Sequence, residues 1–162
     1  MNAALTKNMS TLRETITYLN SNGVTGLVNT PKERAYKYNC WGFTRGLLED
    51  AEDFEWVEMS GMEDWLKANT RKVTRPKCGD IVVFRGIDED GCCCNMYDEE
   101  GEDFEVCTCP PELLHTAILV DPVKMIIIHK PGGRKLERCT VDDCLRRHHV
   151  YGEVTEFRRK TK

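Results

Sequence analysis

The chain has 162 residues, of which 40% are hydrophobic and 31% are charged. This length suits one domain with a core of its own, and the composition excludes a wholly disordered or fibrous protein. No apolar run approaches the ~20 residues that cross a bilayer, and the first residues lack the apolar stretch of a secretory signal. We therefore expect a cytoplasmic protein without a membrane span.

Acidic residues are concentrated in one part of the chain. Residues 86–114 contain ten Asp or Glu and no Lys or Arg, which leaves 17 acidic against 23 basic residues elsewhere, a net charge of +6. The stretch 86–112 is also long and without hydrophobic periodicity, which indicates an insertion between two strands that offers an acidic surface to a basic protein partner. The basic cluster at Arg158–Lys160 is too short for nucleic-acid binding, and we expect it to be a solvated tail.

Helical signals precede strand signals along the chain. Thr11–Glu14 and Ser60–Glu63 have the form of capping boxes, which predicts a helix at each. A further helix is expected from Trp41 onward, and Gly42 and Gly46, four residues apart, would let another segment pack closely against it.

Short apolar runs bounded by turn residues follow. They predict strands over residues 79–84, 115–120 and 125–129, the last two as an antiparallel hairpin, then a short helix capped by Thr140 and a final strand over 150–157. Helices first and antiparallel strands after them are typical of an α+β fold. We expect one domain over residues 1–162, with N-terminal helices packed on a small antiparallel sheet.

Cys40 and two histidines form a candidate catalytic group. Cys40 falls at a predicted helix start, where the helix dipole favours a thiolate. His115 begins one strand of the hairpin and His129 ends the next, so pairing brings them together as a base and its orienting group. The alternative is that Cys40 is a small buried hydrophobic residue and each histidine an ordinary strand-end residue.

Four segments in this order resemble the NlpC-type family of papain-like cysteine peptidases, which is related to the CHAP amidases. They are Asn39–Arg45 (NCWGFTR), Gly79–Phe84 (GDIVVF), His115–Val120 (HTAILV) and Ile128–Gly133 (IHKPGG). The resemblance implies a papain-like fold. It also implies hydrolysis of peptide or isopeptide-type amide bonds, including those of peptidoglycan stem peptides, and no cofactor for catalysis. A short chain of this layout is similar to what a phage or bacterial accessory locus encodes, and would reach the cell wall on lysis.

The resemblance assigns roles by position. Cys40 matches the nucleophile, His115 the base and His129 the orienting residue, while Tyr38 and Trp41 are expected to contact substrate. The family pattern has Ser after the cysteine, so Trp41 is a departure that reshapes the pocket beside the nucleophile.

Nine cysteines are present, and five of them lie in the acidic segment. Without a secretory signal, metal or catalytic use is favoured over a disulfide framework. A structural zinc is one interpretation, although the spacing differs from the usual C-x₂₋₄-C pairs, and a reduced or disulfide-linked loop is the other. Two further functions stay open: a catalytically silent binding or inhibitory protein on the same fold, and a small zinc-binding interaction protein. The candidate zinc ligands are Cys92, Cys94, Cys107 and Cys109.

Overall fold

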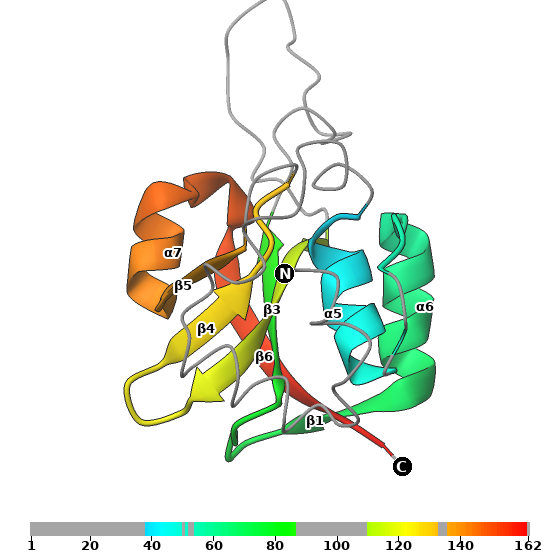
Figure 1. Cartoon of the computed structure of the whole chain (residues 1–162), viewed down its shortest axis with the longest axis horizontal. Helices are drawn as coiled ribbons and strands as arrows, with labels where there is room; N and C mark the ends of the chain where they lie inside the picture. The colour runs from blue at the N-terminus through cyan, green and yellow to red at the C-terminus, as the bar shows by residue number, and fades with distance from the viewer. Residues whose placement is uncertain (1–37, 50, 52–53, 87–109, 133–135, 162) are drawn as a thin grey trace, which may run out of the picture.

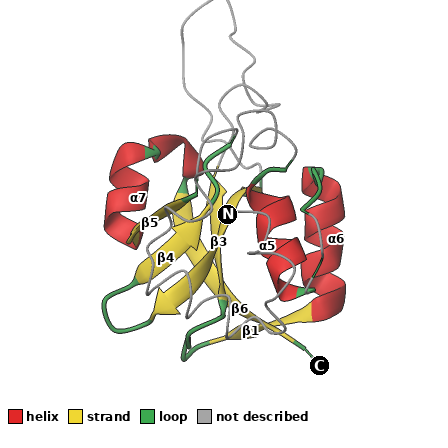
Figure 2. Ribbon diagram, in the orientation of Figure 1, coloured by secondary structure: helices red, strands yellow, loops and turns green. Residues whose placement is uncertain are grey.

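The computed structural model describes residues 38–49, 51, 54–86, 110–132 and 136–161. Within these ranges three α-helices accompany six strands in one antiparallel sheet, in the order β1-β6-β2-β3-β4-β5 (Figures 1 and 2). The α+β class with an antiparallel sheet is confirmed. No described helix is both long and apolar enough to cross a membrane. The elements are α5 (Cys40–Leu48), α6 (Met59–Asn69), β1 (Thr70–Val73), β2 (Ile81–Gly86), β3 (Glu112–Asp121), β4 (Ile126–His129), β5 (Glu137–Thr140), α7 (Val141–Arg147), the 3₁₀ turn η1 (His149–Tyr151) and β6 (Glu153–Lys160).

The sheet is covered on both faces. Helices α5 and α6 lie on one side and α7 on the other (Figure 1). Strand β2 shows the consequence: Ile81 and Val83 belong to the core under α5 and α6, while Val82 and Phe84 belong to the core under α7. Because side chains alternate along a strand, a strand buried on both faces is apolar throughout.

Helix α5 begins at Cys40 because Asn39 caps it. The Asn39 Oδ1 accepts a hydrogen bond of 2.9 Å from the Gly42 N–H, as a favourable N-cap residue does. The same buried side chain donates from Nδ2 to the Val57 carbonyl oxygen at 2.7 Å. Asn39 therefore fixes both the start of α5 and the chain that leads into α6.

The predicted close packing at Gly42 and Gly46 is confirmed. A Cβ on Gly42 would lie 1.7 Å from the carbonyl oxygen of Glu55, and one on Gly46 would lie 2.4 Å from the Phe54 ring. The segment before α6 thus crosses α5 on its glycine face.

The predicted hairpin of β3 and β4 is also confirmed, with Ala117 opposite His129 in the ladder. At the turn, Asp121 Oδ1 accepts from the backbone N–H groups of Val123 and Lys124. The two ends of the expected acidic insertion, Gly86 and Glu112, are themselves paired strand residues. The stretch 87–109 between them lies outside the described residues, as does the helix expected at 11–14.

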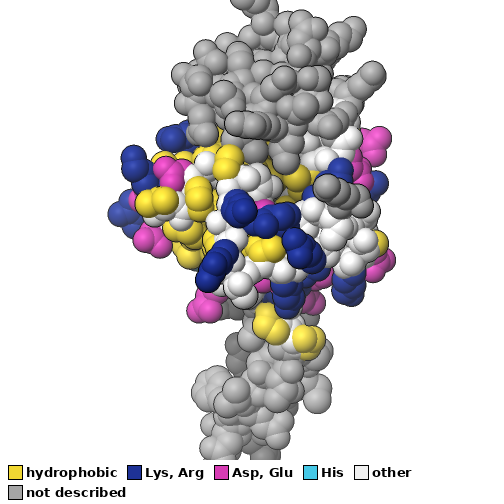
Figure 3. All heavy atoms as spheres, turned by 90° about the horizontal axis from the view of Figure 1, so that it is seen from below, with side chains coloured by type: hydrophobic (Ala, Val, Ile, Leu, Met, Phe, Trp, Pro, Cys, Tyr) yellow, Lys and Arg dark blue, Asp and Glu magenta, His cyan; other side chains and the backbone are white. Residues whose placement is uncertain are grey.

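Two expectations about charged and polar ends were wrong. A helix is present where the Ser60–Glu63 box predicted one, but α6 begins at Met59 and its N-cap residue Glu58 makes no side-chain capping bond, so Ser60 lies inside the helix and does not cap it. Residues Arg158–Lys160 are part of β6 instead of a solvated tail, because each side chain has a partner: Arg159, for example, makes two hydrogen bonds of 2.7 Å to Asp80. Lys and Arg side chains gather on the lower face of the molecule (Figure 3).

Candidate active site

Cys40 lies where the first turn of α5 meets β3. Its side chain is 7% exposed. Backbone N–H groups of Cys40, Trp41 and Thr116 are directed at the sulfur. The Thr116 hydroxyl also lies 3.3 Å from the Cys40 carbonyl oxygen and 2.9 Å from the Thr44 hydroxyl. The thiol is thus held between a helix N-terminus and the backbone of one strand.

Burial dominates the electrostatics of this thiol. It raises the pKa of Cys40 from 9.0 to about 12, although the three N–H groups and the Lys130 ammonium act in the opposite direction. The helix N-terminus acts in the expected direction, but burial outweighs it. Cys40 is a protonated thiol at neutral pH.

Lys130 is a buried cation that faces this thiol. Its Nζ donates to the Gly132 carbonyl oxygen at 2.7 Å and lies 5.0 Å from the centre of the Tyr38 ring. Burial lowers the Lys130 pKa to about 8. Tyr38, expected to contact substrate, is buried against Phe54 with ring centres 5.1 Å apart, and its described contacts are with protein groups.

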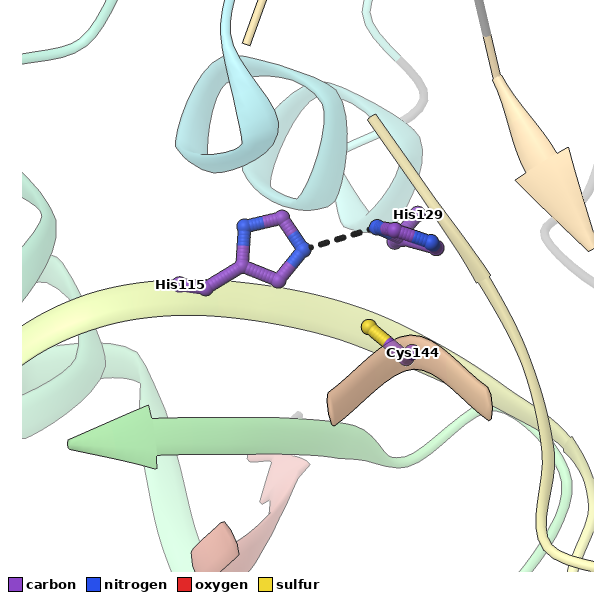
Figure 4. A group of neighbouring side chains, drawn as sticks. All are labelled: His115, His129 and Cys144. Atoms are coloured by element: carbon purple, nitrogen blue, oxygen red, sulfur yellow. Dashed lines mark hydrogen bonds between the residues drawn. The ribbon is translucent and has the colours of Figure 1, made fainter. Parts of the chain in front are cut away.

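The two predicted histidines meet on the sheet. His115 Nε2 and His129 Nδ1 are 3.0 Å apart, and Figure 4 shows the ring of each directed at the other across neighbouring strands. Both side chains are fully enclosed, at 1% and 0% exposed. The hydrogen bond between them fixes the orientation of both rings, as expected from the hairpin.

His115 has an apolar, aromatic environment. Its ring stacks on Tyr151 at 3.8 Å with 3° between the ring planes, and its centre lies 5.4 Å from that of Phe84. Burial, and to a smaller extent the positive charge that His129 and His148 can carry, holds the pKa of His115 well below 6.5. The ring is therefore neutral at physiological pH and can accept a proton.

The predicted triad is assembled only in part. In the described portion of the chain no hydrogen bond joins the Cys40 sulfur to the His115 ring; the sulfur meets the backbone N–H of Thr116 instead. Strand alternation is the cause. The Thr116 side chain turns towards α5, so that of His115 turns towards α7 and η1. The sulfur lies beside the peptide bond that follows His115.

Trp41, the other expected substrate contact, is half-buried against the core under α5 and α6. Its indole Nε1 is buried, and no described residue accepts a hydrogen bond from it. A buried donor of this kind beside Cys40 is suited to an acceptor on a bound molecule.

On its other side His129 faces a second group of polar side chains. Its Nε2 lies 3.5 Å from the Cys139 sulfur and 3.4 Å from Glu137 Oε2, and that carboxylate oxygen lies 3.2 Å from His148 Nε2. The His148 side chain is only 11% exposed because it packs on the rings of His129 and Tyr151.

A second thiol in this region, Cys144, comes from α7. His115, His129 and Cys144 place ligand atoms within 4.8 Å of one another (Figure 4). A hydrogen bond from Cys144 lowers the pKa of Cys139, and that of Cys144 is raised in turn. The four cysteines expected to bind zinc, at positions 92, 94, 107 and 109, lie outside the described residues.

Sequence reasoning missed several members of the site. Lys130 is in the IHKPGG segment and follows an apolar strand, which was a usable signal for a buried cation. Glu137 and Cys139 precede the predicted Thr140 cap with a spacing of two, which is the period of a strand face. Tyr151 offered no local signal, because the chain reaches His115 only through η1.

Comparisons of the chain with protein-family models, curated proteins and solved structures find no match. The functional argument therefore depends on the residues and their geometry.

Proposed function

We propose that the protein is a cysteine hydrolase that cleaves peptide or isopeptide-type amide bonds. Cys40 is the nucleophile, His115 the base and His129 the orienting residue. The observation that carries the proposal is the position of the Cys40 sulfur: it is at a helix N-terminus, against the peptide after His115, whose ring is hydrogen-bonded to His129. Thiol catalysis requires a nucleophile, a base that takes its proton and a third group that orients the base.

A papain-like arrangement is part of this proposal. It is supported by a helix with the cysteine at its first residue that packs on an antiparallel sheet, and by histidines on two neighbouring strands of that sheet. Resemblance to the NlpC-type family gives the substrate class, an amide bond in a peptide such as a peptidoglycan stem peptide.

Both reacting groups are neutral at rest. The high pKa of Cys40 and the low pKa of His115 have the same cause, burial, and they favour a thiol and an imidazole over a preformed ion pair. If His115 donates from Nε2 to His129, its Nδ1 is the free base. Because the sulfur and the His115 ring lie on opposite faces of β3, Cys40 reaches this nitrogen only if the start of α5 or of β3 shifts when substrate binds.

The chemical steps follow from these roles. As the sulfur bonds to the amide carbonyl carbon, its proton moves to His115 Nδ1, and the carbonyl oxygen becomes an oxyanion. Backbone N–H groups at the start of α5 can donate hydrogen bonds to this oxyanion, and the Lys130 ammonium supplies a positive charge near it. The C–N bond then breaks, the amine leaves with the proton from His115, and water hydrolyses the thioester to return the thiol.

The test is turnover by matched cysteine variants. Purified protein is offered a panel of dipeptide and stem-peptide amides, and amine release is measured for the wild type, Cys40→Ala and Cys78→Ala. Cys78 is an exposed cysteine and serves as the control. The proposal requires that Cys40→Ala loses turnover and Cys78→Ala keeps it. Equal turnover in both variants would refute it.

Histidine variants test the roles. His115→Ala should lower kcat/KM more than His129→Ala, since the base contributes more than its orienting group. If no substrate of the panel is cleaved while an electrophilic peptide ketone also fails to modify Cys40, the protein is a binding protein on this fold.

A further inference from the structure

We propose that His129, Glu137, His148 and Cys139 form a binding site for one divalent transition metal ion, Zn²⁺ in the first place. This site is separate from the cysteine-rich segment and goes beyond the proposed hydrolysis. His129, Glu137 and His148 place one ligand atom each within 4.8 Å of one another, and the Cys139 sulfur approaches the same ring nitrogen of His129.

Three measured distances fit edges of a tetrahedral zinc shell. Tetrahedral zinc holds nitrogen or oxygen at ~2.0–2.1 Å and sulfur at ~2.3 Å, so neighbouring ligand atoms are about 3.3–3.6 Å apart. Here the His129 Nε2 is 3.4 Å from Glu137 Oε2 and 3.5 Å from the Cys139 sulfur. The edge from Glu137 Oε2 to His148 Nε2 is 3.2 Å. One ion among the His129, Glu137 and His148 atoms would contact all three with small adjustments, and the Cys139 sulfur, which approaches the His129 nitrogen, would complete the shell after rotation of its side chain.

The scaffold presents these ligands from regular structure. His129 and Glu137 are opposite each other in the β4–β5 ladder, and Cys139, two residues after Glu137, shares its face of β5. His148 is the C-cap residue of α7. Three ligands therefore come from adjacent strand positions, which hold them more rigidly than a loop does.

Hydrogen bonding alone leaves this group incompletely satisfied. The His129 Nε2 can carry one proton, yet a carboxylate oxygen and a sulfur both face it. A metal ion would satisfy nitrogen, oxygen and sulfur together. Two neutral imidazoles, one carboxylate and one thiolate also carry two negative charges, which balance a divalent cation. The competing cation is Arg147, whose guanidinium is 3.7 Å from Glu137 Oε2 and is 49% exposed, so it can move aside.

The surroundings complete the site. A metal-binding histidine generally donates its other ring N–H to an acceptor, and the His129 Nδ1 faces His115 Nε2 at 3.0 Å. His129 is fully enclosed, whereas the Glu137 side chain is 27% exposed and gives an ion access from solvent. Nitrogen, carboxylate and sulfur together suit zinc better than magnesium or calcium.

The test measures metal binding directly. Protein freed of metal by a chelator is titrated with Zn²⁺ against a chromophoric competitor, for the wild type, His148→Ala, Glu137→Gln and His149→Ala. His149 is the adjacent, exposed histidine and serves as the control. We expect His148→Ala and Glu137→Gln each to lower the affinity for one zinc ion by at least about tenfold. His149→Ala should bind zinc with the affinity of the wild type. Identical zinc binding by all four proteins, or no tight zinc in the wild type, would overturn the proposal.

Cobalt gives a second readout that does not depend on the stability of a variant. Co²⁺ bound in the wild-type site should show a thiolate charge-transfer band, which Cys139→Ser should lose while weaker ligand-field absorption persists. A charge-transfer band that is unchanged in Cys139→Ser would place the ion at other cysteines. Because neither readout uses turnover, failure of the metal site and failure of the proposed hydrolase are distinguishable.

Discussion

Replacement of Gly42 by Ala tests the packing that surrounds Cys40. The new Cβ would lie 1.7 Å from the Glu55 carbonyl oxygen and 2.9 Å from its carbonyl carbon, both backbone atoms that no side-chain rotation can move. The segment at Glu55 must therefore retreat from α5. Asn39 resists this, because its side chain is hydrogen-bonded to the Val57 carbonyl oxygen at 2.7 Å.

The magnitude follows from three contributions. Overpacking of a filled site costs about 1–3 kcal/mol, and loss of a buried hydrogen-bond partner costs about 1–3 kcal/mol. Alanine in a helix regains up to about 1 kcal/mol over glycine. We therefore expect Gly42→Ala to lower the free energy of unfolding by roughly 2–4 kcal/mol.

Gly61→Ala is the matched control. Gly61 is also helical, but the nearest atom to its Cβ would be the Val57 Cγ1 at 3.8 Å, an ordinary contact, so this variant should gain about 0.5–1 kcal/mol. Urea unfolding followed by circular dichroism measures both free energies. Thermal unfolding should separate the midpoints of the two variants by about 10 °C, since 1 kcal/mol corresponds to ~2–4 °C at this size. Equal stability of the variants would refute the close contact between α5 and Glu55.

Three further predictions concern the candidate sites. Because the pKa of Cys40 is raised from 9.0 to about 12, iodoacetamide at pH 8 should label it roughly a thousandfold more slowly than an exposed thiol such as Cys78, measured by peptide mass mapping; faster labelling of Cys40 would contradict its burial. Because burial lowers the pKa of His115, the acid limb of the pH–rate profile of hydrolysis should be centred below 6.5; an acid limb centred at or above 6.5 would be evidence against His115 as the base. Stoichiometric Zn²⁺ should inhibit hydrolysis in the wild type and much less in His148→Ala, each compared with its own zinc-free rate.

The sequence predicted the parts of the fold whose signals are local. Asn39 is a good N-cap before an apolar stretch, and the apolar runs of β3 and β4 are separated by an Asp-Pro turn, so the start of α5 and the hairpin were predictable. Thr140 also caps α7 as expected, accepting from the Asp143 N–H at 3.1 Å.

Other elements depend on contacts that no local pattern reveals. Strand β1 is polar, with two of its four residues exposed, and exists because it pairs with β6. The same pairing brings Arg158 and Arg159 into the sheet, although a short basic stretch by itself predicts a solvent-exposed segment. Tertiary pairing outweighs the local preference in both strands.

In the candidate site, too, one contact could be predicted from local pattern and another could not. The His115–His129 contact followed from the hairpin register, which is a local property. The separation of Cys40 from the His115 ring did not, because it depends on which face of β3 each residue occupies. A shift of one residue in that strand exchanges its faces, and the sequence alone does not set the register against α5.

The hydrogen bond between His115 and His129 links the two proposed sites through the direction of one proton. For hydrolysis, His115 must donate from Nε2 to His129 Nδ1, so that its own Nδ1 is free to receive the proton of Cys40. A metal ion on His129 Nε2 requires the reverse, with the proton on His129 Nδ1 and the neutral His115 ring protonated at Nδ1. In that state His115 has no lone pair to offer Cys40. The two proposed activities, metal binding and hydrolysis, would therefore exclude each other through a single 3.0 Å contact, without any movement of the backbone.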